Sequence, residues 1–160
     1  MSQQTQNLTD YVTKPDTDST ALLRATDLSV GYRNRTVVSG VNLAIRPGEV
    51  HSIIGSNGTG KSSLLRAMAG IVTPSSGQVE LLGAPLTKLR AHERATRLAY
   101  LPQHTPADAA IDVRTVVALG RYAHHRRRDR FRSSLNSTDH DIVAYALDRV
   151  GVTALADRPI

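Results

Sequence analysis

A glycine-rich run at residues 55–62 constrains the fold more than any other feature of the chain. It reads Gly-Ser-Asn-Gly-Thr-Gly-Lys-Ser and satisfies the phosphate-binding loop pattern, with four free positions between its first glycine and the Gly-Lys-Ser end. The apolar, β-branched run Val50–Ile54 comes before it and predicts a short buried strand. Helical spacing follows from Lys61 to Ala69, with Gly70 as the stop. Strand, loop and helix therefore come in the order that a phosphate-binding loop requires.

The residue types of this loop suit a triphosphate. Glycines let the backbone curl so that successive N–H groups point at phosphate oxygens, and the helix that follows directs its positive end to the same place. Lys61 supplies a point charge for the β- and γ-phosphates, and the Ser62 hydroxyl is a ligand of the kind that Mg²⁺ accepts beside its waters. The sequence thus predicts that ATP and Mg²⁺ bind at Gly55, Ser56, Asn57, Gly58, Thr59, Gly60, Lys61, Ser62 and Ser63.

Strand and helix patterns alternate along the rest of the chain. Strands are expected at residues 22–30, 37–38, 41–45, 78–82 and 98–101, and helices at 89–97, 112–120 and 138–150. This alternation favours an α/β fold with a parallel component, and the strand-rich opening predicts an antiparallel β subdomain in front of it. Thr138 and Asp141 have the spacing of a capping box for the last helix. Its apolar side is expected to consist of Val143, Leu147 and Val150.

The composition narrows the class of protein. With 160 residues, 40% of them hydrophobic and 21% charged, the chain has the size and make-up of one soluble globular domain. The absence of cysteine excludes disulfides and cysteine-ligated metal sites, and no apolar stretch of about 18 residues is present to span a membrane. Residues 1–20 are polar and lack the basic start and apolar run of a secretory signal, so they predict a disordered leader.

The positive charge is concentrated in one segment. Six Arg and one Asp lie between Arg121 and Arg132, and without this basic segment the net charge falls from +6 to +1. We interpret it first as a solvated surface, and next as a face near anionic lipid headgroups or a membrane subunit. Nucleic-acid binding is disfavoured because aromatic residues, which stack on bases, make up only 4% of the chain. We predict that His124 and His125 are solvated and that His51 is packed as a structural residue.

Beyond the loop, several stretches resemble the ATP-binding subunit of an ABC transporter, over about residues 22–160. "LLRATDLSVGY" resembles the opening strand of such cassettes, which ends at an aromatic that stacks on adenine, here Tyr32. "LAYLPQ" resembles the strand that enters the Q-loop and places its glutamine at Gln103. "VRTVVALGRYAHH" resembles the helical subdomain of cassettes that serve iron–siderophore, haem and cobalamin importers. The resemblance implies that Gln103 binds Mg²⁺ and senses the γ-phosphate, and that Lys61 and Gln103 serve catalysis.

The chain also departs from the pattern of this family. Ser56 stands where the family usually has Pro, and Ser63 where it usually has Thr. "LADRPI" resembles the run that leads into the signature loop, but the 160 residues contain no Ser-Gly-Gly segment, no second acidic strand and no switch histidine. The resemblance therefore implies a P-loop NTPase fold of the ABC cassette type, truncated before the signature motif and without the C-terminal part of its core.

The resemblance also implies an organisation. Residues 1–20 are the expected leader, and residues 21–160 are the N-terminal portion of an ABC ATP-binding domain. Within that portion, residues 21–103 form the β subdomain and the P-loop core up to the Q-loop, and residues 104–160 form part of the helical subdomain.

The implied function is that of an ATPase subunit that energises an ABC importer, with an iron–siderophore or related metal chelate as cargo. The 160 residues alone are expected to be inactive. Expected partners are transmembrane permease subunits, a second ATP-binding subunit and, indirectly, a substrate-binding protein, on the cytoplasmic face of the cell membrane. Two alternatives stay open, a non-transport ABC ATPase of translation or DNA repair and a nucleotide-binding fragment without activity.

Overall fold

The computed structural model describes residues 20–33, 35–103, 111–125 and 135–160. Residues 1–19 of the expected leader and residues 126–132 of the basic segment lie outside this described part. The described residues divide into two compact units, the first formed by those up to residue 94 together with residues 98–100, and the second by residues 95–97 together with those from residue 101 onward. No helix in the described part is both long and apolar enough to cross a membrane.

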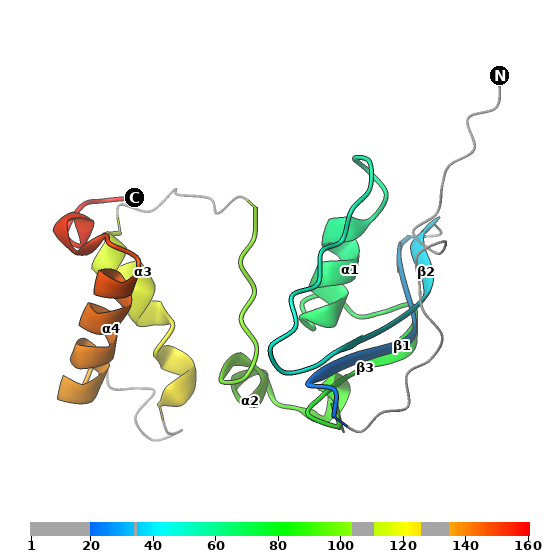
Figure 1. Cartoon of the computed structure of the whole chain (residues 1–160), viewed down its shortest axis with the longest axis horizontal. Coiled ribbons are helices and arrows are strands. Elements are labelled where there is room, and N and C mark those ends of the chain that lie inside the picture. The colour runs from blue at the N-terminus through cyan, green and yellow to red at the C-terminus, as the bar shows by residue number, and fades with distance from the viewer. Residues whose placement is uncertain (1–19, 34, 104–110, 126–134) are drawn as a thin grey trace. The chain divides into compact units, whose positions relative to one another are not determined.

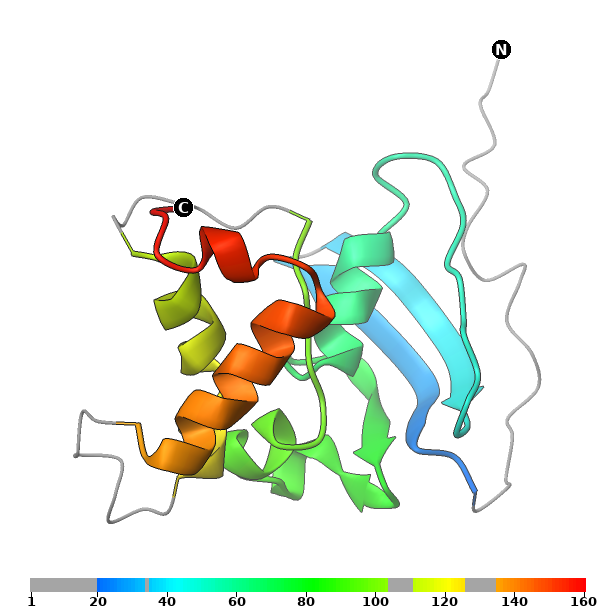
Figure 2. The ribbon, with the colours of Figure 1, turned by 60° about the vertical axis from the view of Figure 1, so that its left-hand side comes forward.

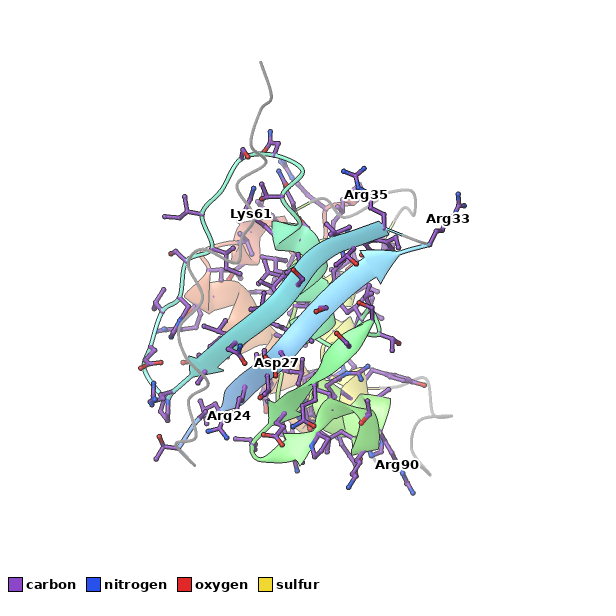
Figure 3. All side chains as sticks on the ribbon, turned by 90° about the vertical axis from the view of Figure 1, so that its right-hand side faces the viewer. Arg24, Asp27, Arg33, Arg35, Lys61 and Arg90 are labelled. Atoms are coloured by element: carbon purple, nitrogen blue, oxygen red, sulfur yellow. The ribbon has the colours of Figure 1, made fainter. Side chains whose placement is uncertain are left out.

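The first unit is built on an antiparallel sheet with the strand order β2-β1-β3-β4 (Figure 1). Its strands are β1 (Leu23–Tyr32), β2 (Arg35–Ile45), β3 (Ser76–Leu81) and β4 (Ala84–Pro85). β1 and β2 form a long hairpin, which Figure 3 shows along its length. The expected antiparallel β subdomain is thus confirmed, and the two short strands expected at 37–38 and 41–45 are parts of one continuous strand.

One face of this sheet is buried under helix α1 (Lys61–Met68). Side chains of β1 alternate between buried and more exposed positions, as the period of a strand requires. A bulge at Asp27, where φ is 46°, moves the buried set from odd to even positions. The main core residues from the strands and the helix are Leu23, Ala25, Leu28, Val30, Val38, Val41, Leu64, Ala67, Met68, Val79 and Leu81. The helix expected from Lys61 is confirmed, and Gly70 follows it with a φ of 67°.

Two short strands that the sequence predicts do not form in the described part of the chain. Residues 50–54 and 98–101 have no strand conformation, and Val50, Ile54 and Leu101 are 93%, 84% and 91% exposed. A strand needs a neighbour with which its N–H and C=O groups can pair, and none of the described strands pairs with either segment. The prediction of a buried strand before the loop is therefore wrong here, because an apolar sequence does not itself supply the partner strand.

The second unit is helical. Helices α3 (Val113–Leu119) and α4 (Ser137–Arg149) pack against each other (Figure 2). Short 3-10 turns lie at Tyr122–His124 and Thr153–Leu155 of this unit. Earlier in the sequence come a 3-10 turn of the first unit at Leu86–Lys88 and helix α2 (Ala91–Ala95). The core consists of Val143, Leu147 and Ala156, with Val113, Val117, Ala118 and Val152 packed against it. Val150 lies beyond the end of α4 and is 70% exposed, so its expected place on the apolar side is wrong.

The N-cap residue of α4 lies two positions earlier than the sequence predicts. Asn136 is the N-cap residue, and its side-chain oxygen accepts a hydrogen bond from the backbone N–H of Asp139 at 2.8 Å. The Asp139 carboxylate accepts one from the backbone N–H of Asn136 at 3.2 Å. This reciprocal pair satisfies two N–H groups at the helix start. The capping box therefore consists of Asn136 and Asp139, and the prediction of Thr138 and Asp141 is wrong.

Candidate functional site

The glycine-rich loop leads directly into the N-terminus of α1. Gly58 and Gly60 have φ values of 82° and 94°, which residues with side chains rarely adopt. Gly60 is the N-cap residue of α1, and the first turn of this helix contains no acidic side chain. No carboxylate of that turn therefore occupies the unpaired N–H groups and the positive end of the helix dipole, so both can receive an anion.

Gly60 also allows the helix to start close to the sheet. A Cβ atom at this position would lie 2.5 Å from Val38 Cγ2 and 2.8 Å from Val37 Cγ1, which is closer than carbon atoms approach one another. Only glycine lets α1 begin against β2 in this way. Figure 3 shows Lys61 toward the same end of the hairpin as Arg33 and Arg35. The loop and the end of the hairpin thus belong to one region of the first unit.

The Lys61 ammonium reaches back over the loop. Its Nζ donates hydrogen bonds to the backbone carbonyls of Gly55 at 2.8 Å and Ser56 at 2.6 Å. The Thr59 hydroxyl donates to the same Ser56 carbonyl at 3.0 Å. An ammonium has three N–H donors, so these two bonds hold the loop and leave the third for an oxygen of a ligand. The loop and its cation are therefore arranged so that an anion can bind there.

The remaining loop residues are open to solvent or partly so. Asn57 and Ser62 are exposed, and Ser63 is half-buried. Ser62 and Ser63 lie in the first turn of α1, directly after Lys61. Ser62, where the sequence predicts a ligand for a metal ion, is thus an exposed residue at the start of the helix.

Tyr32 ends β1, opposite Arg35 of β2, and is 45% exposed. Arg66 of α1 lies near Tyr32. A hydrogen bond to Tyr100 is the main cause of a raised pKa of the Arg66 guanidinium, and Tyr32 raises this pKa more weakly. The structure therefore places an exposed tyrosine at the hairpin end, as stacking on a base requires. Sequence reasoning did not single out Arg66 or Tyr100, and Arg66 carries no signal beyond its place in α1.

Gln103 belongs to the second unit, where it follows Pro102 and is exposed. The other predicted site residues, Tyr32 and residues 55–63, belong to the first unit. The structure thus brings the loop and the hairpin end into one unit and holds the predicted metal-binding glutamine in the other.

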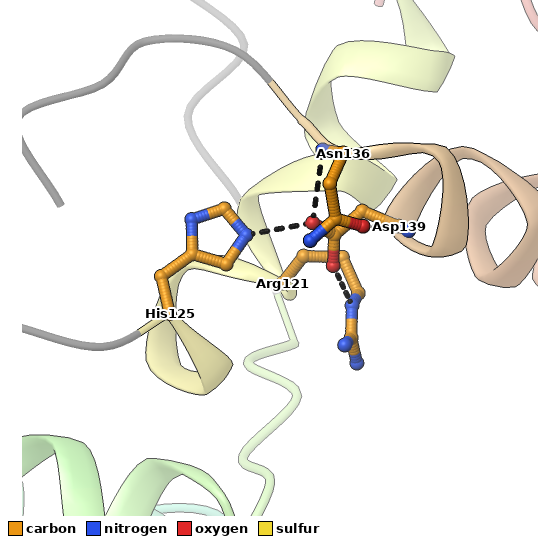
Figure 4. A network of polar contacts seen from close by, with 4 residues as sticks. All are labelled: Arg121, His125, Asn136 and Asp139. Atoms are coloured by element: carbon orange, nitrogen blue, oxygen red, sulfur yellow. Dashed lines mark hydrogen bonds and ion pairs between the residues drawn. The ribbon is translucent and has the colours of Figure 1, made fainter. Parts of the chain in front are cut away.

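A buried carboxylate lies in the second unit, in contact with residues of the basic segment that the sequence predicts to be solvated. Asp139 is 1% exposed. It accepts a hydrogen bond from Arg121 Nε at 2.8 Å, and its other oxygen lies 2.9 Å from His125 Nε2 (Figure 4). The hydrogen bond from Arg121 is the largest cause that lowers the pKa of Asp139 to about 2, and the hydrogen bonds from His125 and the Asn136 N–H act in the same direction. Burial of the carboxylate acts in the opposite direction and raises this pKa.

The predictions that Arg121 and His125 are solvated are therefore wrong. Their side chains are only 20% and 13% exposed, because a buried carboxylate needs cationic or donor partners and they supply them. The Asn136 and Asp139 pair was the available sequence signal, since it has the spacing of a capping box. His124, by contrast, is exposed as predicted.

His51 does not pack in a core. Its Nε2 lies 2.9 Å from Glu49 Oε2, and both side chains are about a third exposed, at 32% and 36%. Glu49 also accepts a hydrogen bond from the backbone N–H of Arg46 at 2.8 Å, which closes the turn after β2. The hydrogen bond from His51 is the main cause of a lowered pKa of Glu49. The prediction of a packed structural histidine is wrong, because residues 50–54 do not enter a sheet.

Comparison with known proteins identifies the family to which the loop and its flanks are similar. A family model described as "ABC transporter" matches residues 38–160. The chain is 34% identical to the iron(3+)-hydroxamate import ATP-binding protein FhuC of Bacillus subtilis, over 86% of this chain and 50% of the relative. It is 36% identical to the ferric enterobactin transport ATP-binding protein FepC of Escherichia coli, over 90% and 52%. It is 43% identical to the hemin import ATP-binding protein HmuV of Pseudomonas entomophila, over 76% and 45%.

Solved structures show the same kinship. An ABC transporter in an inward-facing conformation matches with a TM-score of 0.65 and 25% identity, over 88% of this chain and 48% of that one. A nucleotide-free ATP-binding cassette from an ABC transporter matches with a TM-score of 0.63 and 22% identity, over 87% and 57%, and supports the fold alone. The expected cassette fold is thus confirmed. The chain spans about half the length of the curated relatives that it matches.

Proposed function

The chain belongs to the ABC transporter family, and from this premise we propose that it is the ATP-binding portion of an importer subunit for iron–siderophore complexes or related metal chelates. The observation that carries the proposal is the loop at the start of α1, where Lys61 is already seated on two loop carbonyls. Similarity to import subunits for hydroxamate-bound iron, enterobactin and hemin favours import over the alternative of translation or DNA repair.

Nucleotide binding follows from membership of this family. In our proposal the backbone N–H groups of Gly55–Gly60 and the Lys61 ammonium hold the phosphates of ATP. The uncompensated N-terminus of α1 supports the same assignment, because negative charge is stabilised there. Tyr32 stacks on the adenine ring, an assignment that rests on its exposure at the hairpin end and on the family pattern.

Magnesium fits the residues present. Mg²⁺ prefers oxygen ligands and keeps several of its waters, and the exposed Ser62 hydroxyl and the exposed Gln103 side-chain oxygen are oxygen donors. We assign Mg²⁺ to Ser62, and the family pattern alone adds Gln103 as a second ligand. When bound, it neutralises negative charge on the β- and γ-phosphates.

The proposed reaction is transfer of the γ-phosphoryl group to water. Such reactions depend mostly on positioning and charge neutralisation. Lys61 and the loop N–H groups supply both for the ground-state phosphates, and Gln103 transmits the presence of the γ-phosphate to a permease subunit. In the whole protein the partners are permease subunits and a second ATP-binding subunit, at the inner face of the cell membrane.

Calorimetric titration of the purified chain with ATP and Mg²⁺ tests the proposal. Lys61→Ala removes a charged hydrogen-bond donor, so the affinity is expected to fall about 10- to 150-fold. Lys88→Ala is the matched control, because Lys88 is an exposed lysine of the same unit, on the turn Leu86–Lys88. Equal affinity of Lys61→Ala and the unaltered chain would refute the proposal.

Phosphate release is the second measurement. Among the 160 residues, none matches the water-activating glutamate or the signature loop of the family, so we expect this chain to bind ATP without appreciable turnover. Clear turnover that Lys61→Ala abolishes would contradict this expectation.

A further inference from the structure

We infer that Thr59 is a positioning residue of the loop: its hydroxyl holds the Ser56 carbonyl and thereby aims the next backbone N–H at the phosphate. The inference rests on the proposed function of the loop as the ATP-binding site. It concerns the side chain of Thr59, whereas the loop pattern itself leaves this position free.

The Ser56 carbonyl is the point where two side chains of the loop converge. It accepts hydrogen bonds from the Thr59 hydroxyl at 3.0 Å and from Lys61 Nζ at 2.6 Å. A carbonyl oxygen has two lone pairs, so these two donors account for its full accepting capacity. Its direction is therefore fixed by side chains that lie three and five positions further along the chain.

Fixing this carbonyl also fixes a donor. The peptide group between Ser56 and Asn57 is planar and trans, so its C=O and N–H point in opposite directions. When the Ser56 carbonyl is turned toward Thr59 and Lys61, the Asn57 N–H is turned away from them. The Thr59 hydroxyl thus acts on the ligand through the direction of a backbone N–H that it does not itself contact.

The surroundings show that the Thr59 hydroxyl serves the loop and not the helix. Gly60 is the N-cap residue of α1, and no side chain caps the helix start. At Gly55, a Cβ atom would lie only 3.2 Å from Thr59 Oγ1, so a glycine at the first position of the loop leaves room for this hydroxyl. Thr59 is β-branched, which restricts its χ1 angle and makes the bond to Ser56 less costly to form.

The bond matters most when nucleotide arrives. Lys61 then shares its three donors between two carbonyls of the loop and the phosphate oxygens. The Thr59 hydroxyl continues to hold the Ser56 carbonyl while the ammonium turns to the ligand. Without it, the shared ammonium alone holds the Ser56 carbonyl, and the carbonyl oxygen turns more easily toward the phosphate, where two groups of negative character would face each other.

The test compares Thr59→Val with Thr59→Ser by calorimetric titration with ATP and Mg²⁺. Valine keeps the shape and removes the hydroxyl, whereas serine keeps the hydroxyl. One net hydrogen bond predicts about three- to tenfold weaker binding for Thr59→Val, and we expect Thr59→Ser to bind within about twofold of the unaltered chain. We expect the thermal midpoints of both variants to match that of the unaltered chain. A general structural role of Thr59 would instead lower the midpoint of Thr59→Val. If Thr59→Val fails to fold, Thr59→Ala replaces it.

Two results would overturn the inference: wild-type affinity in Thr59→Val, or equal weakening in Thr59→Val and Thr59→Ser. Lys61→Ala, measured alongside, separates this failure from that of the proposed function. Weak binding by Lys61→Ala with wild-type binding by Thr59→Val refutes only the role of Thr59. Wild-type affinity in Lys61→Ala refutes the ATP site itself.

Discussion

Replacement of Gly60 by Ala is expected to destabilise the first unit by two separate mechanisms. The backbone at Gly60 has a φ of 94°, and a left-handed conformation costs a residue with a side chain about 1–2 kcal/mol. The added methyl group would also lie 2.5 Å from Val38 Cγ2 and 2.8 Å from Val37 Cγ1. Overpacking of this kind costs about 1–3 kcal/mol, so the two effects together predict a loss of about 2–5 kcal/mol.

Two other glycines provide matched controls. Gly58 and Gly83 have φ values of 82° and 75°, and a Cβ atom at either would meet nothing within 4 Å. Alanine at these positions should therefore cost only about 1–2 kcal/mol, the price of the backbone conformation. The difference between Gly60→Ala and the controls isolates the close approach of α1 to β2.

The assay is urea unfolding of the full chain, followed by far-ultraviolet circular dichroism and extrapolated to water. A loss of this size is a large part of the 5–15 kcal/mol that stabilises a typical domain, so the transition of Gly60→Ala should move clearly to lower urea. Unfolding of Gly60→Ala at the same urea concentration as Gly58→Ala and Gly83→Ala would refute the reasoning, because it would mean that β2 does not crowd the helix start.

Two further predictions concern the second unit. The pKa of Asp139 is about 2 in the folded chain, below its ordinary value of 3.8, so its charge stabilises the fold fully above about pH 4, and this contribution is lost as the pH falls through about 2. Thermal midpoints measured across this range should fall for the unaltered chain and stay flatter for Asp139→Asn; parallel curves would contradict the assignment. Leu147→Ala should cost about 2–5 kcal/mol because Leu147 is 1% exposed. Val150→Ala, at a position 70% exposed, should change the free energy of unfolding by no more than about 0.5 kcal/mol. Equal urea midpoints of Leu147→Ala and Val150→Ala would show that the core is misassigned.

Features that depend on nearby residues could be predicted from the sequence. The loop, the start of α1 and its end at Gly70 follow from glycines and from helical spacing over a few residues. The N-cap Asp112 is of this kind too, since its side chain accepts the Thr115 N–H at 2.6 Å within one turn. The roles of Tyr32 and Gln103 remain predictions that rest on the family pattern.

Features that need a distant partner could not be predicted from spacing. Residues 50–54 are apolar enough for a core strand, yet Val50 and Ile54 stay exposed because no described strand pairs with them. Arg121 and His125 belong to a run that reads as a charged surface, but α4 presents a buried carboxylate to both. Sequence patterns indicate what a side chain prefers, and they do not indicate which segment will meet it.

The phosphate-binding loop could be predicted from residues 55–62 alone, because glycines, a lysine and a helix start within eight residues set that curl locally. The long-range contacts of the chain followed from its tertiary structure. Gly60 packs on β2, from a segment more than twenty residues earlier, and Asp139 meets Arg121 across eighteen positions. Backbone conformation is set over a few residues, whereas packing and the pairing of buried charge depend on which segments the fold brings together.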